Sequence, residues 1–342
     1  MQSNTGAGRR FIPAIGSGLR CRPPWPTGRE GNRRLWPGAR SAIGGLDRAG
    51  GGENGAGIPY ALGVNPTPAD DLKFAIDLAR SAGEIVRHHY GHVERLTKTH
   101  VATTDEAVTE ADRATQRHIV AGLRERYPAD GIIGEESDSG TSITFDVKDP
   151  AGRNWVIDPI DGTNNFIAGL GAFAVCIGLL EAGRPTLGVV YDVTRDVTYA
   201  GAVGVGATVN GRAVHVAATP LGDASVLMMT SNLLGKDGQA PGWARRWIGQ
   251  TAWKTRILGS AALEAVQVAA GVAHGAVTCN GKLWDVVAPG AVVLAAGGKL
   301  TDLSGREIFP FDLKGYVGAK VPFLAAGPAA QPMLLAEFRN YP

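Results

Sequence analysis

Two aspartates, three residues apart, follow an apolar run in the stretch WVIDPIDGTNNF, residues 155–166. The apolar residues 155–157 predict a buried strand, and Pro159 and Gly162 predict a turn after it. A polar turn accounts for one acid and the glycine, but not for Asp158 at the edge of the apolar run as well. The pattern therefore has two interpretations: an ordinary strand end, or a strand that brings two carboxylates to one point.

Further acids stand at the ends of predicted elements: Glu135 and Glu136 in GEES, Asp285 in LWDVV and Asp112 in VTEAD. Carboxylates gathered at one point suit a hard cation such as Mg²⁺, which prefers oxygen ligands and often shares its shell with a phosphate. Two such ions can hold the attacking and leaving oxygens of a phosphoryl transfer. Each acid also has an ordinary alternative: a surface loop for the glutamates, a helix N-cap for Asp285, and a capping box with Thr109 for Asp112.

The composition is typical of a soluble globular protein. Of the 342 residues, 44% are apolar and 19% are charged, and no run of about 18 apolar residues predicts a membrane span. The three cysteines are far apart and form no ligand motif, which favours reduced thiols in a cytoplasmic protein. The net charge of +2 gives no reason to expect a nucleic-acid partner.

Residues 1–65 differ from the rest of the chain. They hold fifteen glycines, six prolines, nine arginines and three acids, and no helical or strand period persists in them. Such a composition cannot bury enough apolar surface to form a core. We expect this segment to be a disordered N-terminal extension, or a spurious one that is translated from an upstream start codon. Because this segment carries six excess positive charges, the remainder carries a net charge of −4.

The remaining residues predict a mixed α+β and α/β fold in two halves, 66–214 and 215–335. In the first half, apolar periodicity predicts one helix from Pro68 and another between Thr109 and Pro128. Short β-branched runs between residues 154 and 214 predict an antiparallel meander sheet. In the second half, strands alternate with apolar helices, which predicts a smaller mixed α/β unit that completes the site.

The ordered set of motifs resembles the inositol monophosphatase family. After DEAVTEAD, the motifs GEES, WVIDPIDGTNNF, GSAALEAV and WDVVAPGAVVLAAGG occur in that order, and the resemblance covers residues 68 to 330. One such motif is a weak signal, whereas the ordered set is specific. The resemblance implies a layered αβαβα sugar-phosphatase fold and a homodimer. It also implies a phosphomonoesterase that uses two or three Mg²⁺ ions to activate water against a small phosphorylated metabolite.

The same resemblance implies roles for individual residues. Metal ions would be bound by Glu135, Asp158, the backbone carbonyl of Ile160, Asp161 and Asp285. The attacking water would be oriented and deprotonated by Asp112 and Thr163. The substrate would be contacted by Gly162, Thr163, Gly259, Ser260, Ala261 and Thr278. A mobile lid would include Lys98 and Asp105.

Thr278 departs from the family pattern, because inositol-specific members carry a glutamate there that binds ring hydroxyls. Threonine is shorter and uncharged, so the substrate stays open among inositol, sugar and related metabolite phosphates such as histidinol phosphate. The alternatives are a 3′-phosphoadenosine-type nucleotidase, a fructose-1,6-bisphosphatase, and a metal or metabolite sensor that keeps the fold without catalysis. Lys254, Arg256 and Lys282 flank the expected leaving-group pocket, either as partners of a second phosphate or as solvated surface residues.

Overall fold

The computed structural model describes residues 67–90, 95–97, 107–137, 144–235 and 238–342, without the side chains of 95–97 and 107–109. The predictions for residues 1–65, for the capping role of Thr109, and for Lys98 and Asp105 lie outside what is described. Within these ranges, none of the helices has the length and apolar composition that crossing a membrane requires.

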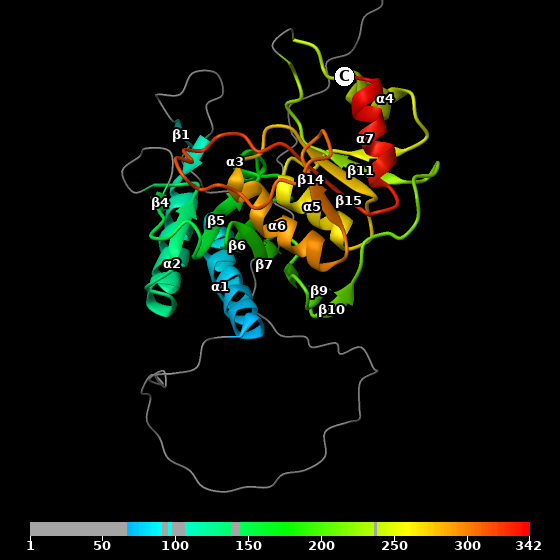
Figure 1. Cartoon of the computed structure of the whole chain (residues 1–342). Coiled ribbons are helices and arrows are strands. Elements are labelled where there is room, and N and C mark those ends of the chain that lie inside the picture. Colours follow the sequence, from blue (N-terminus) through cyan, green and yellow to red (C-terminus); the bar gives the residue numbers. More distant parts are fainter. Residues whose placement is uncertain (1–66, 91–94, 98–106, 138–143, 236–237) are drawn as a thin grey trace, which may run out of the picture. The chain divides into compact units, whose positions relative to one another are not determined.

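Five layers of helices and sheets, in the order αβαβα, make up the described part of the chain (Figure 1). The first layer holds α1 (Pro68–His89) and α2 (Glu110–Arg126). An eight-stranded sheet follows, and α5 (Ala261–Ala269) and α6 (Leu283–Ala295) lie between it and a five-stranded sheet. The outer layer holds α4 (Gly242–Gly249) and α7 (Gln331–Asn340). This layering confirms the predicted fold.

The larger sheet has the strand order β10-β9-β8-β7-β6-β5-β3-β4. From β5 to β10 every neighbouring pair is antiparallel, as the predicted meander requires, but β3 pairs with β5 in parallel. Its strands are β3 (Gly131–Gly134), β4 (Thr144–Asp146), β5 (Arg153–Asp161), β6 (Ala174–Glu181), β7 (Arg184–Asp192), β8 (Val197–Ala202), β9 (Gly206–Val209) and β10 (Arg212–Val214).

The smaller sheet has the order β12-β11-β13-β15-β14 and mixes parallel and antiparallel pairs. Its strands are β11 (Val226–Met229), β12 (Lys254–Arg256), β13 (Gly275–Thr278), β14 (Lys299–Thr301) and β15 (Phe323–Ala326), and a separate antiparallel pair is formed by β1 (Arg95–Thr97) and β2 (Ala107–Thr109). The two larger sheets lie on either side of residue 214 in sequence. The division of the chain into two halves at that residue stays a prediction.

A capping interaction between neighbouring residues sets the start of helix α1. Thr67 forms a capping box with Asp70, since Thr67 Oγ1 accepts a hydrogen bond from Asp70 N at 3.2 Å and the Asp70 carboxylate accepts one from Thr67 N. The small residues of its buried face, including Ala75 and Gly83, let the helix approach the sheet closely. A Cβ on Gly83 would lie 2.3 Å from the Tyr191 ring, so only glycine fits there.

Helix α6 lies on the other face of the same sheet, over two glycines that pair across β6 and β7. Gly178 and Gly188 are register partners, and both face the α6 backbone at Ala288. A Cβ on Gly188 would lie 2.1 Å from the Ala288 carbonyl oxygen. The two glycines therefore set how closely α6, and the Asp285 that it carries, approaches the sheet.

We expect Gly188→Ala to destabilise the protein by about 1–3 kcal/mol, because the new methyl group must push α6 away from the sheet. In a chain of this size, each kcal/mol lowers Tm by about 2–4 °C. Thermal unfolding followed by circular dichroism measures the change. Gly222→Ala is the matched control, since a Cβ there meets nothing within 4 Å. Equal Tm values for the two variants would contradict the close-approach explanation.

Candidate active site

Strand β5 brings Asp158 and Asp161 to the same side, although residues three apart in a regular strand point to opposite faces. The pairing with β6 shifts in register between them: Asp158 pairs with Cys176 and Asp161 with Ala174, so β5 holds one extra residue. Pro159 lies in this irregularity, where it has no N–H to give to a ladder. Asp158 Oδ1 accepts a hydrogen bond from Ile160 N at 3.0 Å, which fixes the turn.

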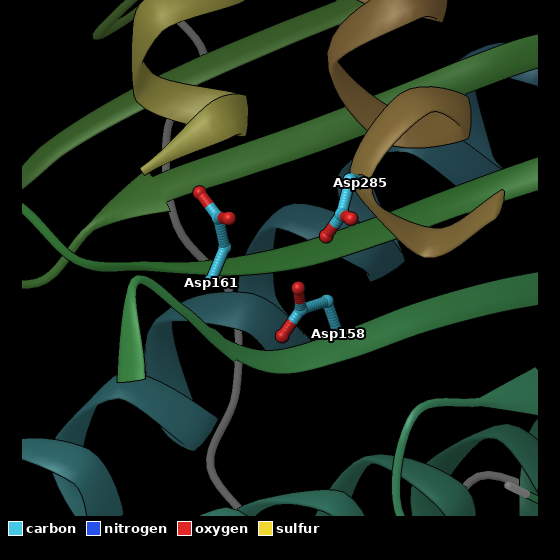
Figure 2. A group of neighbouring side chains, drawn as sticks. All are labelled: Asp158, Asp161 and Asp285. Carbon is cyan, nitrogen blue, oxygen red and sulfur yellow. The ribbon is translucent and has the colours of Figure 1, made fainter. Parts of the chain in front are cut away.

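A third carboxylate, from Asp285, reaches the same point from the first turn of α6. Figure 2 shows Asp158 and Asp161 extending from β5 and Asp285 extending toward them from the helix. One oxygen from each of the three lies within 4.8 Å of the others. Asp285 is the third residue of α6 and not its N-cap; its Oδ2 accepts from Lys282 N at 2.7 Å. The N-cap interpretation of Asp285 is therefore wrong, because the N-cap position belongs to Lys282.

Glu135 joins this group because β3 is parallel to β5. The carboxyl ends of parallel strands meet at one edge of a sheet, and Gly134, the last residue of β3, pairs with Ile157. Glu135 N donates to Ile157 O at 3.4 Å. Its charge is among those that raise the pKa of Asp158, so the GEES motif lies beside the aspartates and is no separate surface loop.

Asp161 receives its hydrogen bonds from the start of α5. The Ser260 hydroxyl donates to Asp161 Oδ2, and Ala262 N donates to the same oxygen at 2.9 Å. Ser260 is 1% exposed and also caps α5, since its hydroxyl oxygen accepts from Leu263 N at 3.2 Å. The Ser260 side chain therefore holds a carboxylate in place. Its predicted contact with substrate stays a prediction.

The carboxylates of the cluster are hard to ionise together. Burial, followed by the charges of Glu135 and Asp161, raises the pKa of Asp158 well above its usual value. Burial also raises the pKa of Asp161, against the lowering effect of its hydrogen bonds. Burial and the charge of Asp161 raise the pKa of Asp285 to about 7. A divalent cation opposes each of these effects, and an all-oxygen donor set is what a hard cation prefers. The residues present therefore fit such an ion.

A cavity of about 190 Å³ opens above the cluster. The predicted site residues on its wall are Glu135, Asp158, Ile160, Asp161, Gly162, Thr163, Gly259, Ala261, Thr278 and Asp285. The wall also contains Glu136 of the GEES motif and Lys282, which was expected to flank the leaving-group pocket. Residues that the sequence did not single out complete it, namely Asn164, Thr230, Ser231, Asn280 and Gly281. Thr230 and Ser231 directly follow β11, and polar residues at that strand end were the available signal for them. Lys254 and Arg256 are exposed and do not line the cavity.

Asp112 lies behind the cavity wall and is 1% exposed. It comes from the first turn of α2 and lies next to Thr163, the first residue of α3 (Thr163–Ile167). The Thr163 hydroxyl has one proton and two acceptors within reach: Ile160 O at 2.9 Å and Asp112 Oδ1 at 3.5 Å. The predicted pair of Asp112 and Thr163 is thus brought together at the edge of the carboxylate cluster.

Comparison with known proteins gives the class and the family. The sequence profile of the inositol monophosphatase family matches residues 68–342. The chain is 35% identical over 245 residues to the fructose-1,6-bisphosphatase/inositol-1-monophosphatase of Thermotoga maritima, covering 71% of this chain and 88% of that protein. It is 36% identical over 245 residues to the histidinol-phosphatase of Mycobacterium tuberculosis, covering 69% and 88%.

A solved structure of a Thermotoga maritima IMPase has the same fold, with a TM-score of 0.67 and 32% identity over 79% of this chain and 97% of that one. Together with the curated relatives, this makes the chain a phosphoric monoester hydrolase. Within that class, it belongs to the inositol monophosphatase family. The resemblance found in the motifs is thereby confirmed.

The metal-free protein is expected to lose stability as the pH rises from about 4 to about 8. Asp285 has a folded pKa of about 7, above its ordinary 3.8, so its stabilising contribution is complete at low pH and is lost as the pH rises through 7. Added Mg²⁺ binds the ionised carboxylates, and it should therefore raise Tm by several degrees more at pH 8 than at pH 5. Thermal unfolding in chelator and in Mg²⁺ tests this, and equal shifts at both pH values would contradict it.

Proposed function

We propose that this enzyme hydrolyses the phosphate monoester of a small polyol, an inositol or sugar phosphate, with the help of two or three Mg²⁺ ions. The observation that carries the proposal is the convergence of Asp158, Asp161 and Asp285 within 4.8 Å on the floor of the cavity. In addition to burial, the charges of Asp161 and Asp285 raise the pKa of Asp158, and the charge of Asp161 raises the pKa of Asp285. A fold keeps so costly an arrangement where a cation is to be bound.

Five groups would hold the ions: the carboxylates of Glu135, Asp158, Asp161 and Asp285 and the backbone carbonyl of Ile160. When bound, Mg²⁺ neutralises the oxygens of the phosphoryl group and lowers the pKa of water. All five groups belong to residues on the cavity wall. The phosphate would lie against the backbone of Gly162 and Thr163, where β5 turns into α3.

Asp112 and Thr163 would handle the proton of the attacking water. The water donates to Thr163 Oγ1 while the threonine proton passes to Asp112 Oδ1, its acceptor at 3.5 Å. The bond from the water oxygen to phosphorus forms as the bond from phosphorus to the leaving alkoxide breaks. The alkoxide takes up a proton from solvent water, and Asp112 returns its proton to the solvent. The products are the free alcohol and inorganic phosphate. No side chain of the protein forms a covalent bond in this sequence.

The wall that comes from the second half of the chain favours a leaving group without a positive charge. Beyond Asp285 and the ammonium group of Lys282, it offers the hydroxyls of Thr230, Ser231 and Thr278 and the amide of Asn280. These groups hydrogen-bond to sugar or inositol hydroxyls. A substrate with an ammonium group, such as histidinol phosphate, would need a carboxylate on this wall beyond those of the metal cluster. Thr278 supplies a hydroxyl at the position where inositol-specific family members carry a glutamate.

A substrate panel tests the proposal directly. Phosphate release is measured with inositol 1-phosphate, fructose 1,6-bisphosphate, histidinol phosphate and 3′-phosphoadenosine 5′-phosphate, with Mg²⁺ and with chelator. We expect the highest kcat/KM with one of the first two and no release in chelator. Preference for the nucleotide or for histidinol phosphate would overturn the substrate class. No release from any member would favour the noncatalytic sensor.

Lys282 is the residue that would distinguish a bisphosphate substrate from a monophosphate substrate. Among the described residues it is the only basic side chain on the cavity wall, and its Nζ lies 5.1 Å from the centre of the Trp284 ring. A second phosphate on the substrate would bind this ammonium group. If fructose 1,6-bisphosphate is the substrate, Lys282→Gln should raise its KM about tenfold or more and leave that of inositol 1-phosphate within about threefold. Equal changes for both would exclude such a contact.

A further inference from the structure

The turn at residues 258–260 is held from two sides by buried or half-buried side chains. On one side, Asn165 Nδ2, from α3, donates to Leu258 O and to Ala172 O, both at 2.8 Å. On the other side, Glu264 Oε1, from α5, accepts from Leu258 N at 2.7 Å and from Gly259 N at 3.0 Å. Asn165 lies between β5 and β6 of the larger sheet, and Glu264 precedes β13 of the smaller one. The turn is therefore clamped between segments from both halves of the chain.

The clamped turn packs directly against the segment that follows β5. A Cβ on Gly162 would lie 3.0 Å from Ala172 O and 3.2 Å from Ser260 Cβ. A Cβ on Gly259 would lie 3.1 Å from the Asn165 amide. Both glycines have positive φ, +92° and +78°, so other residues would be strained there as well as crowded. The turn therefore has no empty space into which it could shift without moving its neighbours.

The turn carries the serine that holds Asp161. Ser260 is its last residue, and its hydroxyl donates to Asp161 Oδ2 beside the hydrogen bond from Ala262 N. A carboxylate bound on one oxygen by two donors has its other oxygen aimed in a fixed direction. Any movement of residues 258–260 is thus transmitted to Asp161, which shares the cation cluster with Asp158 and Asp285.

We propose that Asn165 and Glu264 are positioning residues that fix the 258–260 turn and thereby orient Asp161 for the cation. This rests on the proposed function in that Asp161 is taken to bind Mg²⁺. Polar groups that orient ligand side chains commonly change metal affinity by about 10- to 100-fold when they are removed. Neither residue lines the cavity, so neither contacts the cation, and their hydrogen bonds act on it through the turn.

Two pairs of variants separate this role from a merely structural one. Asn165→Asp keeps the shape of the side chain but replaces the donating amide with a group that repels the carbonyls of Leu258 and Ala172. Its added negative charge would by itself strengthen cation binding, so weaker binding points to the lost orientation. Asn340→Asp makes the same chemical change at an exposed position on α7 and is its control.

Glu264 provides the second pair. Its Oε2 is buried and has no hydrogen-bond partner among the described residues, and burial raises its pKa to about 8. The carboxyl group is thus largely neutral at pH 7, and a glutamine side chain at this position would keep the accepting oxygen. Glu264→Gln should therefore retain function, whereas Glu264→Leu removes the acceptor from both backbone N–H groups.

The experiment is calorimetric titration of the full chain with Mg²⁺ at pH 7, with folding checked by circular dichroism. We expect Asn165→Asp and Glu264→Leu to weaken Mg²⁺ binding about tenfold or more, and Glu264→Gln and Asn340→Asp to stay within about threefold of the unmodified protein. If Asn165→Asp does not fold, Asn165→Ser takes its place, because serine cannot reach both carbonyls.

Folded Asn165 and Glu264→Leu variants that bind Mg²⁺ as tightly as the unmodified protein would overturn the positioning role alone. Weakened binding by Glu264→Gln equal to that by Glu264→Leu would also overturn it, since the acceptor would then be irrelevant. A failure of the proposed function looks different: the unmodified protein itself would bind no Mg²⁺, or Asp161→Asn would bind it unchanged.

Discussion

Replacing Asp158 with asparagine is expected to lower kcat/KM for phosphate release by about 10³-fold or more, while making the metal-free protein more stable. Asp158 is 1% exposed and lies among Glu135, Asp161 and Asp285. Asparagine has the same shape but offers a cation a neutral oxygen in place of a carboxylate. Removing one preorganised electrostatic group from an active site commonly lowers kcat by about 10²–10³-fold, and this group would bind the ion itself.

The gain in stability has a definite pH dependence. The folded pKa of Asp158 is raised by burial and by neighbouring charges, so the stabilising effect of its proton is complete at pH 4 and is lost as the pH rises through the raised pKa. Asparagine does not titrate. The variant should therefore match the unmodified protein near pH 4 and exceed it at pH 8, by about 1.4 kcal/mol for each unit by which the pKa is raised.

Denaturant unfolding in chelator at pH 4 and pH 8, beside phosphate-release kinetics in Mg²⁺, measures both effects. Asp223→Asn is the control, because it removes a carboxylate from an exposed turn far from the cavity wall. An Asp158→Asn variant that still releases phosphate at the original rate would show that this carboxylate binds no catalytic ion. A loss of stability at pH 8 would show that the carboxylate is paired in a way that the structure does not contain.

Asp112→Asn is expected to lower kcat by about 10²–10⁴-fold with little change in KM, the range for loss of a general base. The Asp112 carboxylate is an acceptor for the Thr163 hydroxyl, and an asparagine amide has no basic oxygen to take the threonine proton. Because the proposed substrate and metal contacts are made by other residues, binding should be preserved. Steady-state kinetics over pH 5–9 measure kcat and KM, and calorimetric titration measures Mg²⁺ binding.

Glu110→Gln is the matched control for Asp112, since it removes a carboxylate from an exposed position on the same turn of α2. The loss of kcat in Asp112→Asn relative to the unmodified enzyme should be seen throughout pH 5–9, because asparagine offers no base at any pH. Equal kcat values for the two variants would mean that the proton leaves by another route. A rise in KM without a fall in kcat would place Asp112 in binding instead.

The sequence alone predicted the elements and the identity of the acids. The periodicity of α1, the β-branched runs of β5 to β10 and the turn residues between them depend on local chemistry, and the structure contains each of them. The ordered motifs were enough to indicate the family that the profile over residues 68–342 then confirmed. Local patterns gave no prediction of α4, α7 or β12. Helix α4 and strand β12 are too short to carry a distinctive period, and α7 buries only three of its ten residues.

The meeting of the acids was decided by tertiary structure. Asp158 and Asp161 would point to opposite faces of a regular strand, and only the extra residue in the β5–β6 pairing brings them to one side. Glu135 reaches them because β3 pairs in parallel with β5, and Asp285 because two glycines let α6 approach the sheet. The motifs WVIDPIDGTNNF, GEES and LWDVV thus indicated which groups could bind a cation, since that depends on residue type. Strand pairing and helix packing decided where they meet, since contacts between residues far apart in the sequence have no local signal.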